Sequence, residues 1–503
     1  MVSGSFCRLG TLVGVAIATL QLPVSAQANP DGIRADGSLG TVVERIGADY
    51  NIGGGAFAPG DLNNLFHSFE QFDLEQGETA TFENFINNIG VDIIFARVTG
   101  GSTSTIDGTI NGGDVNLFLM NPDGLVFNEN ASLQIGRSFF GVTADSISFF
   151  DNSRFTASAS GGVPTGDTPF SFIFTGDNGD ITVARSGAGG ATEIEVEVDR
   201  TFALVGGNVR ISDIDEIRAP SGRVEIVGVG SQPFLETPLF VDPNNDIGIS
   251  FAFGTFPEGN GQVLIENSRI ASEVRSSELS SNLFFNSSSP GLDIQTNPDA
   301  GGIFIRASDE ILINNSELTA FTDSDANAGY VGLQTSPQGN IVLDVGSTAF
   351  ATVEMINPNL NPVPDGNGQG GAVLVDTGDL TLNEGSQLQA LVRDGVDSPD
   401  TFAGIIFVQA TGVVQLNGIG SAIFSSVGSS AEDAVGASAN SGIVLIQAGS
   451  VEIDGRQGGA GITTSNFDQG GAGSILIESD TDVIVRGRGG IDESTTSSSI
   501  PVI

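Results

Sequence analysis

The sequence predicts an all-β protein that folds as a right-handed parallel β-helix, a β-solenoid forming a single elongated stack. Short apolar runs, most of them near a glycine, recur at intervals of roughly 30–40 residues from about residue 221 onward. The chain of 503 residues contains 70 Gly and 33 Phe but no Trp, and 39% of its residues are hydrophobic. One such unit cannot bury its inward face alone, whereas stacked units pair equivalent strands about 4.8 Å apart and build a continuous core.

Each repeat consists of a strand, a bend and often a second strand, sometimes followed by a Ser-x-Leu or Ser-x-Ile step. The first strands are expected at residues 224–226, 263–265, 303–305, 341–343, 373–375, 405–407, 443–445 and 475–477. Second strands follow at 311–313, 380–382, 413–416, 451–453 and 483–485, and the serine steps begin at Ser268, Ser316 and Ser386. Runs this short and rich in glycine disfavour a helical solenoid, and the lack of Trp-Asp signatures disfavours propeller blades.

The first 28 residues have the pattern of a removable export signal. Arg8 is the only charged side chain before a mostly apolar or small run from Leu9 to Leu22, and small residues follow at a cleavage site. This run is too short to span a membrane, and no later run reaches the required length of about 20 apolar residues, so no membrane span is expected. Cleavage would remove Cys7, the only cysteine, and leave a chain without disulfides.

Several short strands are expected between residues 115 and 142. Residues 115–120 are largely apolar, and 125–127, 132–135 and 138–142 are similar runs separated by Asn or Gly. Between the first two runs, Asn121, Pro122, Asp123 and Gly124 place Asn, Pro, Asp and Gly at the four positions of a type I turn.

The region from about residue 36 to about residue 150 resembles the secretion domain of the filamentous haemagglutinin family, and its cyanobacterial branch in particular. The resemblance is carried by the sequences NLFHSFEQF, FARVTGG and NLFLMNPDGLVFNENASLQIGRSFFGVTA. Members of this family are the exported partners of two-partner secretion in Gram-negative bacteria. The resemblance implies recognition by an outer-membrane transporter, a β-barrel with periplasmic domains.

The family carries two Asn-Pro signatures, commonly written NPNL and NPNG. Asn121, Pro122, Asp123 and Gly124 occupy the second signature, with Asp where the family usually has Asn. Asn87 and Asn88 lie where the first signature is expected, but the proline is missing there. The export signal, the resemblance and the repeats together predict three regions. These are a signal peptide over residues 1–28, a two-partner secretion domain over 31–220 and a repetitive β-helical passenger over 221–503.

The charge of the chain excludes several classes of partner. Lysine is absent, and 61 acidic against 18 basic residues give a net charge of -43. Binding to nucleic acid or to anionic lipid is disfavoured because no basic stripe is present to release counterions from phosphates. The acids are scattered along the chain, which is typical of a solvated surface that discourages association of sheet edges.

Parallel β-helices also include enzymes that degrade pectin with clustered acidic residues, so a catalytic function is an alternative for this fold. The most suggestive cluster here is Asp213, Asp215 and Glu216, but isoleucine recurs at every third position of this segment. We therefore expect acids at a bend, with the isoleucines turned inward. The only histidine, His67, is expected to be a hydrogen-bonded structural residue, and no catalytic residue is predicted.

No metal site or cofactor is predicted. With one histidine and no cysteine in the mature chain, a zinc site would lack its usual ligands. The oxygen-rich segments 242–246 and 323–325 lack the glycine and bidentate Glu of a calcium-binding EF-hand loop.

The sequence thus predicts a secreted, extracellular surface protein that acts as an adhesin, with a cell-surface or polysaccharide receptor. Two alternatives stay open. One is a β-helix enzyme that degrades polysaccharides, and the other is a contact-dependent toxin carrier that lacks its toxin domain.

Overall fold

The computed structural model describes residues 32–60, 62–83, 85–86, 89–164, 168–185, 193–231, 235–241, 247–249, 256–273, 284–286, 293–295, 301–322, 328–353, 370–392, 402–427, 439–467 and 470–492. The predicted signal peptide, Asn87 and Asn88, and the oxygen-rich segments 242–246 and 323–325 lie outside the described residues. The regular structure of the described residues is entirely β.

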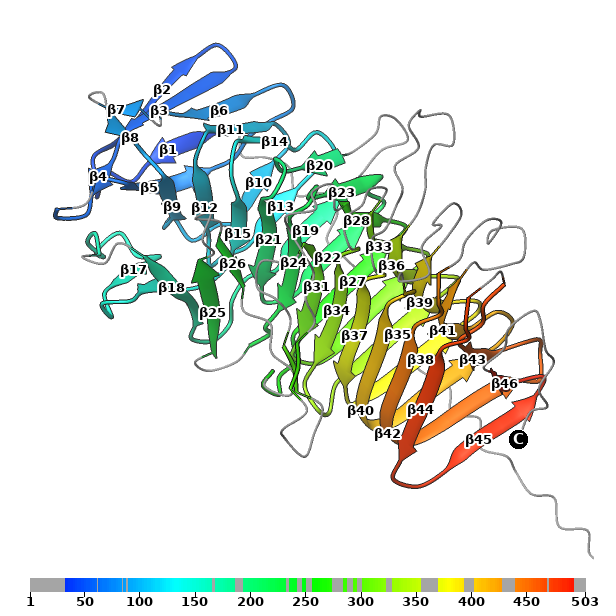
Figure 1. The fold of residues 1–503 in the computed structure, drawn as a ribbon. Helices are drawn as coiled ribbons and strands as arrows, with labels where there is room; N and C mark the ends of the chain where they lie inside the picture. The colour runs from blue at the N-terminus through cyan, green and yellow to red at the C-terminus, as the bar shows by residue number, and fades with distance from the viewer. Residues whose placement is uncertain are drawn as a thin grey trace, which may run out of the picture.

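Parallel strands stack along one axis to form a β-helix with three faces, running from the N-terminal region to the C-terminal region (Figure 1). The first face contains β5 (Asn64–Phe72), β9 (Ile93–Val98), β12 (Asn116–Met120), β15 (Phe139–Val142), β21 (Thr201–Gly206), β24 (Arg223–Gly228), β31 (Gly302–Ala307), β34 (Tyr330–Thr335), β37 (Ala372–Thr377), β40 (Ile405–Asn417), β42 (Ile443–Gly455) and β44 (Ser474–Ser479).

The second face contains β10 (Ser104–Ile106), β13 (Leu125–Phe127), β19 (Ile181–Ala184), β22 (Val209–Ser212), β27 (Gln262–Glu266), β32 (Glu310–Asn314), β35 (Asn340–Asp344), β38 (Asp379–Asn383), the second halves of β40 and β42, and β45 (Val483–Gly487). The third face begins with β3 (Asp49–Gly54), β6 (Thr79–Phe82), β11 (Thr109–Gly113) and β14 (Ser132–Ile135). It continues with β20 (Glu193–Glu195), β23 (Glu216–Arg218), β28 (Arg269–Glu273), β33 (Glu317–Thr322), β36 (Thr348–Val353), β39 (Gln387–Val392), β41 (Ala422–Val427), β43 (Gly461–Thr463) and β46 (Gly490–Asp492).

Antiparallel strands lie beside this stack. At the N-terminal end, β1 (Ile33–Ala35) and β4 (Ala56–Phe57) pair with β5, and β2 (Thr41–Ile46) pairs with β3. A side sheet contains β17 (Arg154–Thr156), β16 (Ser146–Phe149), β18 (Pro169–Phe174), β25 (Leu235–Val241) and β26 (Ile247–Ile249). Two hairpins are formed by β7 (Phe85–Ile86) with β8 (Ile89–Gly90) and by β29 (Phe284–Asn286) with β30 (Asp293–Gln295).

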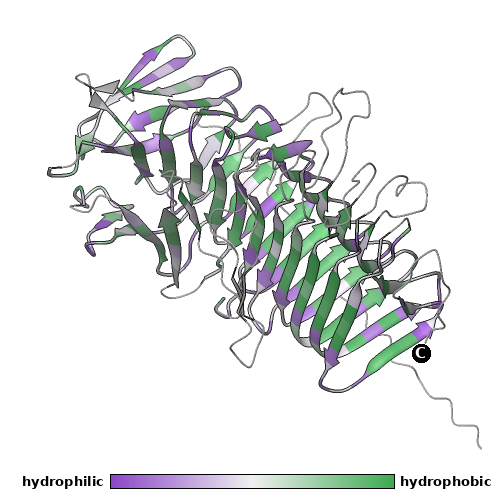
Figure 2. Cartoon of the chain, viewed as in Figure 1, coloured by the Kyte–Doolittle hydropathy of each residue, from purple (hydrophilic) through white to green (hydrophobic). Residues whose placement is uncertain are grey.

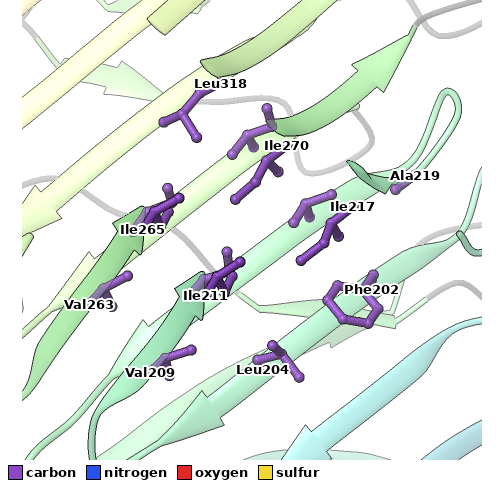
Figure 3. Close-up of a cluster of buried hydrophobic side chains, with 14 of the residues drawn as sticks. Phe202, Leu204, Val209, Ile211, Ile217, Ala219, Val263, Ile265, Ile270 and Leu318 are labelled. Atoms are coloured by element: carbon purple, nitrogen blue, oxygen red, sulfur yellow. The ribbon is translucent and has the colours of Figure 1, made fainter. Parts of the chain in front are cut away.

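The interior is filled by aliphatic side chains from all three faces. On the second face, β32 alternates between buried and half-buried residues, as expected for a strand with one face toward a core. Figure 3 shows how Leu204 of β21, Ile211 of β22 and Ile217 of β23 lie in one cluster. The apolar stripes of successive coils align in Figure 2, so each added coil extends the same core.

The predicted repeat series needs a correction, because it mixes strands from two faces. Val224 of β24 pairs with Ile303 of β31, and Ile303 pairs with Val331 of β34. Val263 and Ile341, which the sequence placed in this same series, lie in β27 and β35 on the second face. Both faces present short Val- and Ile-rich strands beside glycine, so the local sequence does not distinguish them.

The predicted serine steps at Ser268 and Ser316 are confirmed as part of one buried column at the start of the third face, which Ser347 continues. Ser268 N–H donates to Ser316 Oγ at 3.1 Å, and Ser316 N–H donates to Ser347 Oγ at 3.2 Å. These three serines are buried, and so is Ser386, but the Oγ of Ser386 has no hydrogen-bond partner within the described part of the chain. A hydroxyl at this position therefore satisfies a backbone N–H that the turn between two strands leaves without a ladder partner.

A second core, which the sequence analysis missed, covers the outer side of the first face near its N-terminal end. Phe66, Phe95, Phe118 and Phe140 stack from coil to coil with ring centroids 4.9, 4.9 and 4.4 Å apart. The side sheet packs over this stack through residues such as Phe172. Strands β12 and β15 are therefore buried on both sides, which is typical of covered parallel sheets.

Candidate functional site

The Asn-Pro-Asp-Gly segment forms the corner between β12 and β13. Gly124 N–H donates to the carbonyl oxygen of Asn121 at 3.0 Å, which closes a four-residue turn. Pro122 and Asp123 both keep negative φ angles, whereas a type II turn would need a positive φ at Asp123. The predicted type I turn is confirmed, together with the strands that flank it.

The Asn121 side chain ties this corner to the preceding coil. Its Nδ2 donates to the carbonyl oxygen of Ser102 at 2.9 Å and to Ser104 Oγ at 3.0 Å. Its Oδ1 accepts the Asp123 N–H at 3.1 Å, an Asx turn within the type I turn. The side chain is fully buried, so donors and acceptors are all used inside the protein.

The following coil packs directly on the same corner. Gly179 N–H donates to the carbonyl oxygen of Pro122 at 2.7 Å, and Thr103 Oγ1 of the preceding coil donates to that of Asp123 at 2.8 Å. A Cβ on Gly179 would overlap the backbone of Asp123 and Gly124. The turn is therefore held between the coils on either side of it.

Exposure differs sharply among the four residues of this turn. Asn121 and Gly124 are buried, Pro122 is half-buried, and Asp123 is exposed. Asp123 is also the position at which this chain departs from the family's usual Asn. In the folded protein, Asp123 is therefore the most exposed residue of the turn.

The expected first signature lies between β7 and β8 in the sequence. Asn87 and Asn88 lie outside the described residues, and the strands on either side of them, β7 and β8, pair antiparallel with each other.

Arg97, in the FARVTGG segment of β9, is a buried cation that the sequence analysis did not single out. Its Nε donates to Ser68 Oγ at 2.8 Å, and its Nη atoms donate to the carbonyl oxygens of Thr156 and Gly161 at 2.7 and 2.8 Å. Its guanidinium lies 4.9 Å from the ring centroid of Phe155. Burial lowers the pKa of Arg97. The lone Arg within an apolar strand was the available signal for this clamp between the β-helix and the side sheet.

His67 is buried in the N-terminal region, as its predicted structural role requires. Thr41 Oγ1 accepts a hydrogen bond from the Ser68 N–H at 3.0 Å. The hydroxyl proton of Thr41 is therefore free to be donated to His67 Nδ1, which lies 3.3 Å from Thr41 Oγ1. Nε2 has no hydrogen-bond partner within the described part of the chain. Burial lowers the pKa of His67 to about 4, so the ring is neutral at pH 7.

Asp213 and Asp215 lie at a bend between β22 and β23, as predicted, and Glu216 begins β23. The three isoleucines of the segment are buried. Asp213 has a positive φ of 58° and accepts a hydrogen bond from Asn267. Asp215 pairs with Arg185 at 3.2 Å, and Glu216 pairs with Arg269 at 2.8 Å. The pairing with cations and an amide favours a structural or binding role for these carboxylates.

In their geometry and hydropathy, the described residues show features of neither a metal site nor a helical membrane span. They contain no group of three or more His, Cys, Asp or Glu side chains placed to hold a metal ion. In the same part of the chain, no helix has the length and apolarity needed to cross a membrane.

Comparisons with known proteins agree with this geometry. The family model of the TPS secretion domain matches residues 31–240. The crystal structure of the HMW1 secretion domain from Haemophilus influenzae aligns with a TM-score of 0.51 and 15% identity, covering 90% of this chain and 99% of that one. The filamentous hemagglutinin secretion domain aligns at 13% identity over 91% of this chain and 100% of that one, with a TM-score of only 0.29. No curated protein matches the sequence.

The fold is therefore the predicted right-handed parallel β-helix. Residues 31–240 match the TPS secretion domain family, and this match supports a two-partner secretion exoprotein. Proteins with this domain are secreted across the outer membrane, and the family is not an enzymatic one. Membership of the cyanobacterial branch stays a prediction.

Proposed function

We propose that the protein is guided by residues 1–28 into the periplasm, is captured there through residues 31–220 by an outer-membrane β-barrel transporter with periplasmic domains, and acts outside through residues 221–503 as an adhesin. The match of the secretion domain family to residues 31–240 carries this proposal. On the cell surface or in the medium, the passenger would contact a cell-surface or polysaccharide receptor.

The burial of the signature turn suggests when the transporter meets it. Asn121 has no exposed surface in the folded domain, and the coils on either side hold its turn. A transporter that reads Asn121 must therefore bind the chain before this corner closes. Each coil that folds outside the membrane would then prevent the chain from sliding back through the transporter. Successive coils would fold onto one another, because the strands of each coil pair with those of the next.

An adhesive passenger is supported by its architecture and its charge. From β24 to β44 the first face continues with parallel pairing, which builds a long, stiff body with extended faces. The family is not enzymatic, and the acids of the most suggestive cluster are paired with Arg185 and Arg269. An assay of reducing-sugar release from acidic polysaccharides tests the enzyme alternative, and robust turnover would favour it.

Export in the presence and absence of the cognate transporter tests the secretion part of this proposal. The full chain should reach the surface or the medium only when the transporter is present. The Asn121→Ala variant should be exported less, whereas Asp123→Asn, which restores the usual family residue at an exposed position, should be exported as well as the wild type. Equal surface display with and without the transporter would contradict the proposal.

A further inference from the structure

Residues in the left-handed conformation recur at one corner of the β-helix, between the second and third faces. The corner residues with positive φ are Asp213 (58°), Asn267 (48°), Asn315 (46°), Val345 (51°), Glu384 (47°) and Gly418 (87°). Asn267 Nδ2 donates to Asp213 Oδ1 at 2.9 Å, and Asn315 Nδ2 donates to Asn267 Oδ1 at 2.8 Å. A ladder of side-chain hydrogen bonds thus runs along the helix axis for three coils.

A shallow groove follows this corner. Its first part has a volume of about 550 Å³ and is lined by the three ladder residues together with Arg185 and Arg269. Its second part has a volume of about 330 Å³ and includes Glu384. Asp344, the last residue of β35, lines the second part, and Gly346, in the turn that follows β35, lines the first. The two parts therefore adjoin along the axis.

The groove mixes positive, negative and neutral polar groups. Arg185 pairs with Asp215 at 3.2 Å, and Arg269 lies 3.4 Å from Glu317. With Asp213, three carboxylates and two guanidinium groups line the first part, whereas Asp344, Glu384 and Asp454 line the second part without a basic residue. The excess of negative charge disfavours an acidic polymer. Such a lining both donates hydrogen bonds to hydroxyl groups and accepts hydrogen bonds from them. It presents no cationic stripe of the kind that binds phosphates.

Val345 is the unexpected residue in this corner. A β-branched side chain with a φ of 51° is a backbone outlier, and strain of this kind gathers at functional sites. Val345 is 47% exposed, and Ile419, beside Gly418 of the second part, is 66% exposed. Two apolar side chains are therefore exposed at a corner whose other residues are mostly polar. An asparagine in place of Val345 would relieve the backbone strain, because asparagine tolerates a positive φ.

We infer that this corner groove binds an extended, uncharged polysaccharide, with Val345 and Ile419 contacting the apolar faces of sugar rings. The paired carboxylates, amides and guanidinium groups match the hydroxyl groups of such a polymer. Successive coils repeat their polar groups about 4.8 Å apart, which suits a ligand with a repeating unit. An added peptide strand is disfavoured, because the strands flanking this corner are paired from coil to coil. The inference rests on the proposed surface role of the passenger.

Affinity electrophoresis of the full-length exported protein tests this inference. The gels would contain a soluble β-glucan, a galactomannan, dextran or, as the acidic comparator, polygalacturonate. The wild-type protein should be retarded by at least one neutral polymer. Val345→Asn should bind that polymer roughly fivefold or more weakly, because apolar contact is lost. Its Tm should be equal or higher, because Asn tolerates a positive φ.

Ile443→Asn is the matched control, since it removes an exposed β-branched side chain from the first face, away from the corner. Its binding should equal that of the wild type. The inference would be overturned if the wild-type protein were retarded by none of the polymers or by polygalacturonate alone. It would also be overturned if Val345→Asn bound the polymer as well as the wild type. Transporter-dependent export without binding would overturn this inference alone, whereas binding with transporter-independent export would overturn the proposed secretion route alone.

Discussion

Replacing Asn121 by alanine should loosen the corner of the secretion domain. The substitution removes the two hydrogen bonds that Asn121 Nδ2 donates, to the Ser102 carbonyl oxygen and Ser104 Oγ, and the one that its Oδ1 accepts from Asp123 N–H. Each neutral hydrogen bond contributes about 1 kcal/mol net, and the buried Ser104 hydroxyl would lose a partner. We expect local stability to fall by about 2 kcal/mol or more.

Hydrogen exchange of the full-length protein measures this local change, because amides report openings smaller than global unfolding. A loss of about 2 kcal/mol corresponds to roughly 30-fold faster exchange. The change should appear at Gly124 and Leu125, whose N–H groups donate to Asn121 and Asp180 across this corner. The exposed Asp123→Asn substitution is the control and should leave exchange unchanged. Wild-type exchange rates in Asn121→Ala would refute the assignment of Asn121 as the side chain that holds the corner.

Three further predictions concern the same domain. The free energy of unfolding should fall by up to about 3 kcal/mol as the pH drops from about 6.5 to about 4, because the unfolded chain protonates His67 at a higher pH than the folded protein does. Urea titrations of His67→Gln should lack this part of the pH dependence, and a variant whose stability falls as steeply as that of the wild type in this window would contradict the prediction. Arg97→Met should lower the local stability of residues 154–161 by about 3 kcal/mol, because it removes the hydrogen bonds to the carbonyl oxygens of Thr156 and Gly161. Limited proteolysis should then cleave this segment faster, and an unchanged cleavage rate would contradict the prediction. Gly179→Ala should lower the Tm because its Cβ overlaps the neighbouring turn, whereas Gly176→Ala, with open space around its Cβ, should not; equal Tm values would contradict the steric argument.

The local strand pattern near the N-terminus was predictable from the sequence. The predicted strands at 125–127 and 132–135 match β13 and β14, and those at 115–120 and 138–142 differ from β12 and β15 by one residue. Asn, Pro and Gly stand at positions where one turn type is favoured by their own backbone preferences. Short-range steric effects decide such features, so they are visible in the sequence.

The assignment of strands to faces was not predictable in the same way. Val263 and Ile303 have similar neighbours in the sequence, yet they lie on different faces because inserted segments of unequal length separate the coils. The partners of Arg97 were also hidden, since Ser68 and Gly161 are distant in sequence. Likewise, the acids near Asp213 line a groove only because five successive coils stack on one another.

By itself, the sequence determined the β-helix class, the NPDG turn and the secretion route, because backbone preference, alternation and a family signature are local properties. Only the tertiary structure decided that Asn121 is buried between coils, that a phenylalanine stack covers the first face, and that a polar groove is lined by Asp344 and Gly346, the neighbours of Val345. These features depend on which coil lies above which. The register between coils is set by the packing of the whole stack and by the lengths of the connecting segments, and no local pattern specifies it.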